Sequence, residues 1–275
     1  RCSDGRIKTP TLRGKLHLEE VLKKIVKALL FNVLCLRNTD RYYRLRGHIA
    51  HFLVSAKLYE KDQISLINSL DLKDAVVLDV GAGFGVYSKL LSQCVGDGGK
   101  VFSFEANPVI YQEMLRLVKG KNIEPYNIAL SDTNKTTTLY LPSILGSIPE
   151  PSLATLNETN ECELYEVEAK ALDSLDFPLE NVRFIKVDIE GYDFRFLLGA
   201  KETLRKNSAI IQFEEHDVRK LFDDYSKLAD ELGYRVCALV DGALKDIQQA
   251  NIENFRRKHS KGDNIFYLSP RDYKQ

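Results

Sequence analysis

The chain of 275 residues has 39 basic and 39 acidic side chains, and 44% of its residues are hydrophobic. This is an ordinary globular composition, long enough for one large domain with an appendage. The sequence contains no run of about 18 uncharged apolar residues, which argues against a membrane-spanning helix.

The charge is unevenly distributed. Residues 1–60 contain 13 basic and five acidic side chains, so this segment carries +8 and the remainder carries −8. The basic segment could face an anionic membrane, an anionic substrate or the acidic rest of the chain. The five cysteines follow no disulfide or zinc-binding spacing, which favours a reducing compartment, and we expect a cytoplasmic protein.

The first 70 residues are expected to form a basic helical extension or lid. Residues 16–36 place apolar side chains at three- and four-residue steps, which predicts an amphipathic helix. Two more helices are predicted over residues 41–59 and 61–70. Peripheral membrane contact through residues 16–57 and homo-oligomer formation both remain open.

From residue 71 onward, apolar runs alternate with helical patterns, which predicts an α/β domain over residues 71–275. Strands are predicted at 76–80, 100–105, 123–126, 182–187, 208–213, 235–240 and 264–268. Helices are predicted at 86–95, 109–119, 191–206 and 218–232. An insertion near residues 135–170 interrupts the alternation, with a hairpin formed by strands 136–141 and 164–169.

A glycine-rich turn follows the first strand. Asp79 ends this strand, and Gly81, Gly83 and Gly85 come next, a pattern that lets a ligand approach the backbone. The dinucleotide fingerprint would need a small residue where Val86 stands, and the phosphate-binding loop is absent. The loop therefore suits a ligand without phosphate, such as S-adenosylmethionine, although an ordinary strand-to-helix turn is the alternative interpretation.

Acidic residues end other strands of the predicted sheet. Glu105 ends the second strand, where a ribose diol is typically bound. Asp188 and Glu190 follow a later strand, and Glu214-Glu215-His216 follows the next one. Because the carboxyl ends of parallel strands line one crevice, these side chains are expected to converge there. Helix capping explains only part of this concentration of acids.

Four motifs in order resemble those of the FkbM-type class I methyltransferases. They are Asp79-Val-Gly-Ala-Gly-Phe-Gly-Val-Tyr-Ser88, Glu105-Ala-Asn-Pro108, Asn127-Ile-Ala-Leu-Ser-Asp132, and Ile185-Lys-Val-Asp-Ile-Glu-Gly-Tyr-Asp193. The resemblance covers residues 70–268. It implies a Rossmann-like, seven-stranded, S-adenosylmethionine-dependent fold and usually O-methylation of a hydroxyl on a sugar or secondary metabolite. Ala106 stands where a proline is frequent, and Gly83-Phe84 also departs from the common pattern, but neither change removes a side chain that the cofactor needs.

The resemblance also implies roles for individual residues. Asp79 and the three glycines would hold the methionine portion of the cofactor, and Glu105 would hold the ribose. Asn127, Ala129 and Asp132 would lie on the adenine side, and Asn107, the predicted cap of the next helix, is included among the cofactor-binding residues. Asp188 and Glu190 would face the sulfonium and the acceptor.

Methylation of a hydroxyl group requires a general base or a metal ion, and the sequence offers candidates for both. His216 is the candidate base, because it is the histidine at the carboxyl end of a strand, although a helix-capping or solvent-facing histidine is an equal alternative. Asp188 with Glu214 or Glu215 could instead hold a divalent cation such as Mg²⁺, and no metal ligand is assigned.

Two other classes of function remain as alternatives. One is a nucleotide-dependent oxidoreductase, which Val86 disfavours. The other is a non-catalytic scaffold protein that docks through its basic N-terminal helices. The expected partner is a small-molecule or glycan hydroxyl acceptor, and nucleic acid is not expected because the net charge is zero.

Overall fold

The computed structural model describes residues 39–55, 60–118, 120, 122–144, 148–149, 153–160, 162–215, 220–240, 242–247 and 265–273. The chain divides into two compact units, Arg1–Arg46 and Gly47–Gln275. Helix α2 (Thr39–Ser55) spans the boundary, begins two residues before the predicted second helix (41–59) and coincides with it over residues 41–55. The predicted helix over residues 16–36 lies outside the described residues, so the N-terminal extension over residues 1–70 stays a prediction.

The second unit is built on one large sheet. Its strand order is β11-β10-β12-β9-β8-β1-β2-β3. The bounds are β1 Val76–Val80, β2 Lys100–Phe104, β3 Ile123–Tyr126, β8 Val182–Val187, β9 Ile210–Glu214, β10 Tyr234–Val240, β11 Ala243–Asp246 and β12 Ile265–Pro270. Strands β3, β2, β1, β8 and β9 are parallel to one another, whereas β12 is antiparallel to both of its neighbours, β9 and β10. The predicted seven-stranded sheet is confirmed, and β11 adds an unpredicted eighth strand at its edge.

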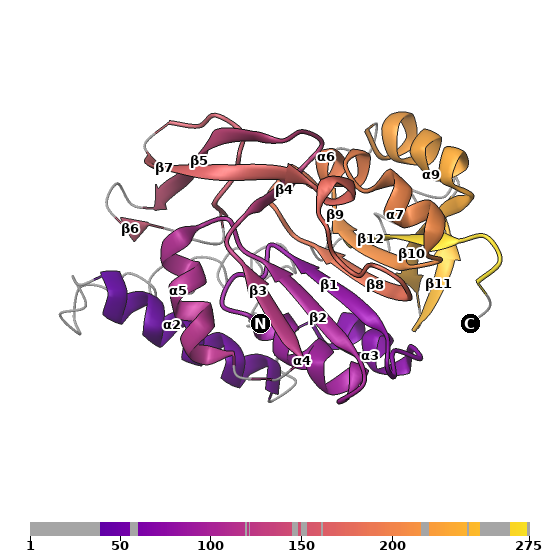
Figure 1. Cartoon of the computed structure of the whole chain (residues 1–275), viewed down its shortest axis with the longest axis horizontal. Helices are drawn as coiled ribbons and strands as arrows, with labels where there is room; N and C mark the ends of the chain where they lie inside the picture. The colour runs from indigo at the N-terminus through magenta and orange to yellow at the C-terminus, as the bar shows by residue number, and fades with distance from the viewer. Residues whose placement is uncertain are drawn as a thin grey trace, which may run out of the picture. The chain divides into compact units, whose positions relative to one another are not determined.

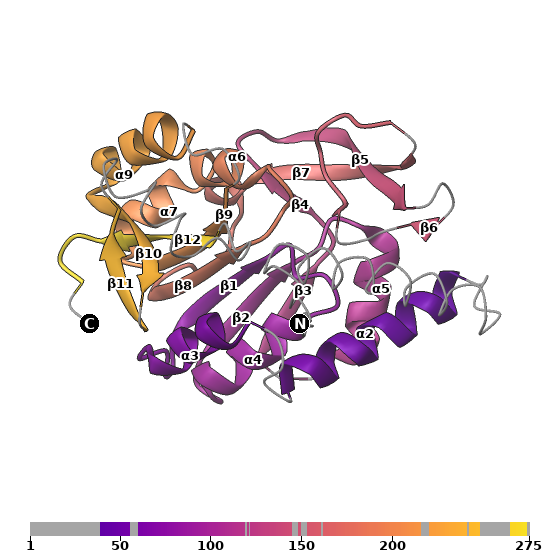
Figure 2. The ribbon, with the colours of Figure 1, turned by 180° about the vertical axis from the view of Figure 1, so that it is seen from behind.

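Helices cover both faces of the sheet (Figure 1, Figure 2). One face carries α3 (Lys61–Ser69), α4 (Val86–Val95) and α5 (Pro108–Leu117). The other carries α6 (Asp193–Leu198), α7 (Lys201–Lys206) and α9 (Ser226–Leu232), with a π-helical turn, η3 (Leu221–Tyr225), before α9. Neighbouring residues of β1 point to opposite faces of the sheet. Val77 belongs to the hydrophobic cluster that includes side chains of α3 and α4, whereas Leu78 belongs to the hydrophobic cluster that includes side chains of α6 and α9. This double burial explains the continuous apolar run of the strand.

The predicted insertion forms a second, smaller sheet with the order β4-β7-β5-β6. Its strands are β4 Ala129–Ser131, β5 Lys135–Ile144, β6 Ile148–Pro149 and β7 Cys162–Ala171. The predicted hairpin is confirmed, since β5 and β7 pair antiparallel from Lys135↔Ala169 to Pro142↔Cys162. Strand β4 follows β3 after two residues, so the small sheet extends from the carboxyl edge of the large one (Figure 1).

The single helix predicted over residues 191–206 is instead two helices. Gly199 separates α6 from α7 and packs against the carbonyl group of Ser131, where a Cβ atom would clash. The Asp173 carboxylate then caps α7 by accepting hydrogen bonds from the backbone N–H groups of Glu202 and Thr203, at 2.8 and 2.9 Å. Both causes of the break therefore come from other parts of the chain.

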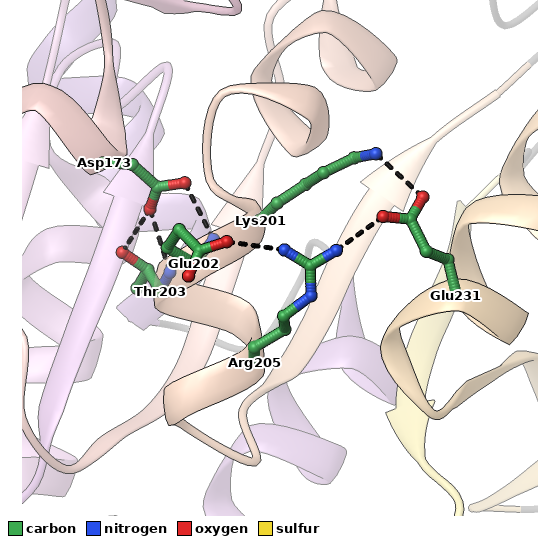
Figure 3. A network of polar contacts seen from close by, with 6 residues as sticks. All are labelled: Asp173, Lys201, Glu202, Thr203, Arg205 and Glu231. Atoms are coloured by element: carbon green, nitrogen blue, oxygen red, sulfur yellow. Dashed lines mark hydrogen bonds and ion pairs between the residues drawn. The ribbon is translucent and has the colours of Figure 1, made fainter.

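Ion pairs tie α7 to α9, as Figure 3 shows. The Arg205 guanidinium contacts Glu202 at 2.6 Å and Glu231 at 2.5 Å, and Lys201 contacts Glu231 at 2.8 Å. These exposed pairs are individually weak, but together with the Asp173 cap they fix the end of this helical layer. None of the described helices combines the length and apolarity needed to cross a bilayer.

Candidate functional site

The glycine loop lies between β1 and α4, at the carboxyl edge of the parallel strands. All three of its glycines have positive φ angles, 76° at Gly81, 55° at Gly83 and 74° at Gly85. A Cβ atom at Gly81 would clash with the carbonyl oxygen of Asp188, whereas a Cβ atom at Gly83 would meet nothing within 4 Å. The loop is therefore packed against the β8 end on one side and open at Gly83, where a ligand can approach the backbone.

The Glu105 carboxylate lies between this loop and the start of α5. Its two oxygens accept hydrogen bonds from the backbone N–H groups of Gly83, at 2.8 Å, and Asn107, at 2.7 Å. The side chain is only 8% exposed. Burial raises the pKa of Glu105 to about 7, although the two backbone hydrogen bonds oppose this shift. The carboxylate is thus fixed at the place where the sequence predicts ribose binding.

The asparagines predicted at the site stabilise the surrounding loops. Asn107 is the N-cap of α5, and its Oδ1 accepts hydrogen bonds from Val109 N and Ile110 N. Its buried Nδ2 has no hydrogen-bond partner among the described residues. Asn127 Nδ2 donates to the Glu105 carbonyl oxygen at 2.7 Å, so it fixes the connection after β3 to the end of β2.

The remaining adenine-side candidates have other contacts. Ala129 is buried in the hydrophobic cluster of the small sheet. Asp132 follows β4 and accepts a hydrogen bond from Arg195 of α6 at 2.6 Å. Burial raises the pKa of Asp132, but the hydrogen bonds and the charge of Arg195 outweigh this effect, so the pKa is lowered. Their assignment to adenine stays a prediction.

Asp79 is fully buried beneath the glycine loop. Its Oδ2 accepts a hydrogen bond from the Ser88 hydroxyl at 2.6 Å, and Oδ1 has no hydrogen-bond partner among the described residues. Burial raises the Asp79 pKa, whereas Lys186 and Ser88 oppose this shift. Asp79 therefore holds the start of α4 to β1.

Asp188 comes directly after β8 and has 46% of its side chain exposed. Its backbone N–H donates to the Val80 carbonyl oxygen at 3.0 Å, and its Oδ2 accepts from Lys186 Nζ at 2.9 Å. The structure thus brings Asp79, the glycine loop, Glu105 and Asp188 to one edge of the sheet, as the sequence predicts.

Glu190 has an unusual backbone for a residue with a side chain, because its φ is 47°. The Thr155 hydroxyl of the insertion donates to the Glu190 carbonyl oxygen at 2.9 Å. A left-handed conformation of a non-glycine residue costs of order 1 kcal/mol or more and needs support from its surroundings. The insertion supplies that support, which sequence reasoning could not detect.

His216 lies outside the described residues, so its role as a base stays a prediction. The acids next to it are described. Glu214 N donates to Asp193 Oδ1 at 3.2 Å, and Glu215 contacts Lys220 at 3.4 Å. In the described part of the chain, no group of three or more His, Cys, Asp and Glu side chains could hold a metal ion, so a divalent cation gains no support here.

Sequence reasoning gave no role to Lys186, Asp193 or His51. Lys186 is buried, and although burial lowers its pKa, the nearby acids Asp188, Asp79 and Glu60 outweigh this effect and raise it. Burial raises the pKa of Asp193 to about 7, and its Oδ2 has no hydrogen-bond partner among the described residues. His51 Nε2 lies 2.9 Å from the carbonyl oxygen of Phe84 in the glycine loop.

A hollow of about 510 Å³ opens beside the loop that follows Asp188. The side chains around it include Asn157, Tyr192, Phe194, Arg195, Lys220 and Asp224. They come from the insertion, from α6 and its preceding loop, and from the segment around η3, so the hollow is assembled from three separate regions. Its volume lies within the range of small-molecule sites.

The sequence model of a family described as Methyltransferase FkbM domain matches residues 79–236. No curated protein matches the sequence. A methyltransferase FkbM from Methylobacillus flagellatus KT shares 13% identity and a TM-score of 0.48, over 88% of this chain and 60% of that one. The chain therefore spans less than two thirds of that protein.

Two other solved structures resemble the chain. A SAM-dependent O-methyltransferase from Thermotoga maritima has 14% identity and a TM-score of 0.43, over 79% of this chain and 67% of that one. A precorrin-6y C5,15-methyltransferase from Geobacter metallireducens GS-15 has 14% identity and a TM-score of 0.41, over 75% and 84%.

Proposed function

Because the chain belongs to the FkbM methyltransferase family, we propose that it transfers a methyl group from S-adenosylmethionine to a hydroxyl group of a sugar, glycan or secondary metabolite. The observation that carries the proposal is the Glu105 carboxylate, held by two backbone N–H groups beside the open Gly83. A fixed carboxylate next to a glycine loop suits a ribose diol and a ligand without phosphate.

The buried polar atoms of this edge fit such a cofactor. Gly83 leaves space at the loop, and Glu105 retains lone pairs for the two ribose hydroxyls beyond its two backbone hydrogen bonds. Asn107 Nδ2 is a buried donor without a partner among the described residues, next to the same carboxylate. Glu105, Asn107 and the glycine loop would therefore hold the nucleoside and methionine parts. The bound cofactor supplies the electrophilic methyl group.

The acceptor would occupy the hollow beside Tyr192. Gly191 and Tyr192, which line this hollow, directly follow Asp188 and Glu190 in the chain, and this connection supports placing the acceptor there. Its volume suits a small molecule or the terminal unit of a glycan. The side chains Tyr192, Arg195 and Asp224 offer an aromatic surface, donors and acceptors for hydroxyl groups.

A neutral hydroxyl must lose its proton as the methyl group is transferred. Asp188 is the proposed group for this role among the described residues, because it is partly exposed and Lys186 fixes its carboxylate. His216, the base predicted from the sequence, is the second candidate. Positioning of the two reactants supplies the rest of the acceleration.

The first experiment is calorimetric titration of the protein with S-adenosylhomocysteine and, separately, with NADH. Binding of S-adenosylhomocysteine alone supports the proposal, whereas binding of NADH alone would favour the oxidoreductase alternative. Transfer of label from methyl-labelled S-adenosylmethionine to a panel of hydroxylated sugars and metabolites then tests the acceptor. Labelling of nitrogen or carbon acceptors only would contradict O-methylation.

A further inference from the structure

A row of polar side chains crosses the face of the large sheet that α3 and α4 cover. Its members lie in register on five adjacent strands, in the order Ser103, Asp79, Lys186, Gln212 and Tyr267. All five are buried. Their neighbours on the same face, such as Val77 and Phe184, belong to a hydrophobic cluster. Burying charge in such a layer is costly, so the charged members require an explanation.

Lys186 is the cation of this row, and its ammonium contacts one acid, Asp188, and the ring of Tyr87. Nζ donates to Asp188 Oδ2 at 2.9 Å and lies 4.7 Å from the centroid of the Tyr87 ring. The Tyr87 hydroxyl donates to Glu60, and Asp79 is the partner of Lys186 in the strand register. Asp188 therefore contacts the ammonium group, the charges of Asp79 and Glu60 also act on it, and the cluster is negative when all three carboxylates are ionised.

This cluster is directly attached to the glycine loop. Asp188 N bonds to the Val80 carbonyl oxygen, and Gly81 packs against the Asp188 carbonyl group. Tyr87 stands on α4, which begins immediately after Gly85. The cluster thus adjoins the loop, and its charges lie in a largely buried environment, where electrostatic interactions are screened less than in water.

We propose that Lys186 is the charge-balancing residue of the cofactor site and sets its preference between the cationic S-adenosylmethionine and the neutral S-adenosylhomocysteine. The inference rests on the proposed function. The two ligands differ by the positive sulfonium, which the carboxylates attract and the Lys186 ammonium repels. With Lys186 in place, the negative charge favours the methyl donor over the product only moderately.

The test is calorimetric titration at pH 8 with each ligand separately, on the unaltered protein, Lys186→Met and Lys186→Arg. Lys186→Met is expected to raise the ratio of S-adenosylmethionine to S-adenosylhomocysteine affinity about tenfold, because a charge repelling the sulfonium is removed. Lys186→Arg keeps the charge and is expected to keep the ratio. A purely structural role of Lys186 would weaken both ligands equally, so an unchanged ratio in Lys186→Met overturns the proposal.

If Lys186→Met does not fold, Asp188→Asn replaces it in the test, because this variant removes a negative charge from the cluster instead of a positive one. Asparagine keeps an oxygen that accepts from Lys186 but removes a negative charge, so the affinity ratio is expected to fall. A ratio that does not fall overturns the proposal. If the unaltered protein binds neither ligand, the proposed function itself fails, whereas binding of both with an unmoved ratio refutes only the role of Lys186.

Discussion

The Glu105 carboxylate is subject to two opposing effects. Burial favours its protonated form, while the N–H groups of Gly83 and Asn107 favour the ionised form. Burial is the larger effect and raises the pKa of Glu105 to about 7. Two further donors from a ribose would move this balance toward the carboxylate.

Replacing Glu105 is expected to weaken cofactor binding specifically. Glu105→Ala removes the acceptor of the proposed ribose hydrogen bonds, which should cost about 1–3 kcal/mol of binding free energy. Calorimetric titration with S-adenosylhomocysteine measures this loss. The control is Glu124→Ala, which removes a partly exposed carboxylate paired with Lys100 on the neighbouring strand. Equal losses in both variants would contradict the assignment of Glu105.

The raised Glu105 pKa also predicts a pH dependence of binding. Ribose hydroxyls donate better to the ionised carboxylate, so affinity for S-adenosylhomocysteine should rise as the pH increases from 6 to 8 through about 7. Titrations across this range measure the effect. Glu105→Gln cannot ionise and should show a flatter profile. If the unaltered protein and this variant have parallel profiles, the dependence does not come from Glu105.

At the scale of the elements, the sequence predicts those helices and strands whose bounds depend on neighbouring residues in the chain. Strand β1 and helix α4 follow from a buried apolar run and a glycine turn, and the Asn107 cap with Pro108 marks the start of α5. The break at Gly199 could not be predicted in this way, because its causes are the Ser131 carbonyl group and the Asp173 carboxylate, both distant in sequence.

The same distinction applies to the candidate site. Asp79, Glu105 and Asp188 end parallel strands, so their presence at one edge follows from strand order. The pairing of Asp132 with Arg195 depends on how the small sheet meets α6, and nothing in the local sequence of either residue indicates it. The support that Thr155 gives to Glu190 likewise depends on an insertion that lies 35 residues away.

The Asp173 cap gives a prediction about helix stability. Asp173→Ala leaves the N–H groups of Glu202 and Thr203 without their carboxylate acceptor, which should lower the free energy of unfolding by about 1–2 kcal/mol (Figure 3). Urea denaturation measures the change. Asp176→Ala, which removes an exposed acid from the loop that follows, should have a much smaller effect. Similar losses in both variants would show that the cap contributes little.

For the molecule as a whole, buried acids at the site reduce stability at high pH. Burial raises the pKa values of Asp79, Glu105 and Asp193, the latter two to about 7. A folded state that holds these protons more tightly than the unfolded chain gains stability at low pH. The gain is complete below the unfolded pKa values and is lost as the pH rises through about 7. For Glu105 alone, it amounts to about 3 kcal/mol at most.

The free energy of unfolding without cofactor should therefore fall as the pH increases from 5.5 to 8. Burial lowers the pKa of His51, which acts in the opposite direction and reduces the slope. Urea denaturation at a series of pH values measures the curve. Asp193→Asn keeps an oxygen to accept from Glu214 N but cannot ionise, so its curve should be flatter. Stability that increases steadily over this range would mean that these carboxyl groups are ionised in the folded protein at little cost, and the site would then be more hydrated than its burial indicates.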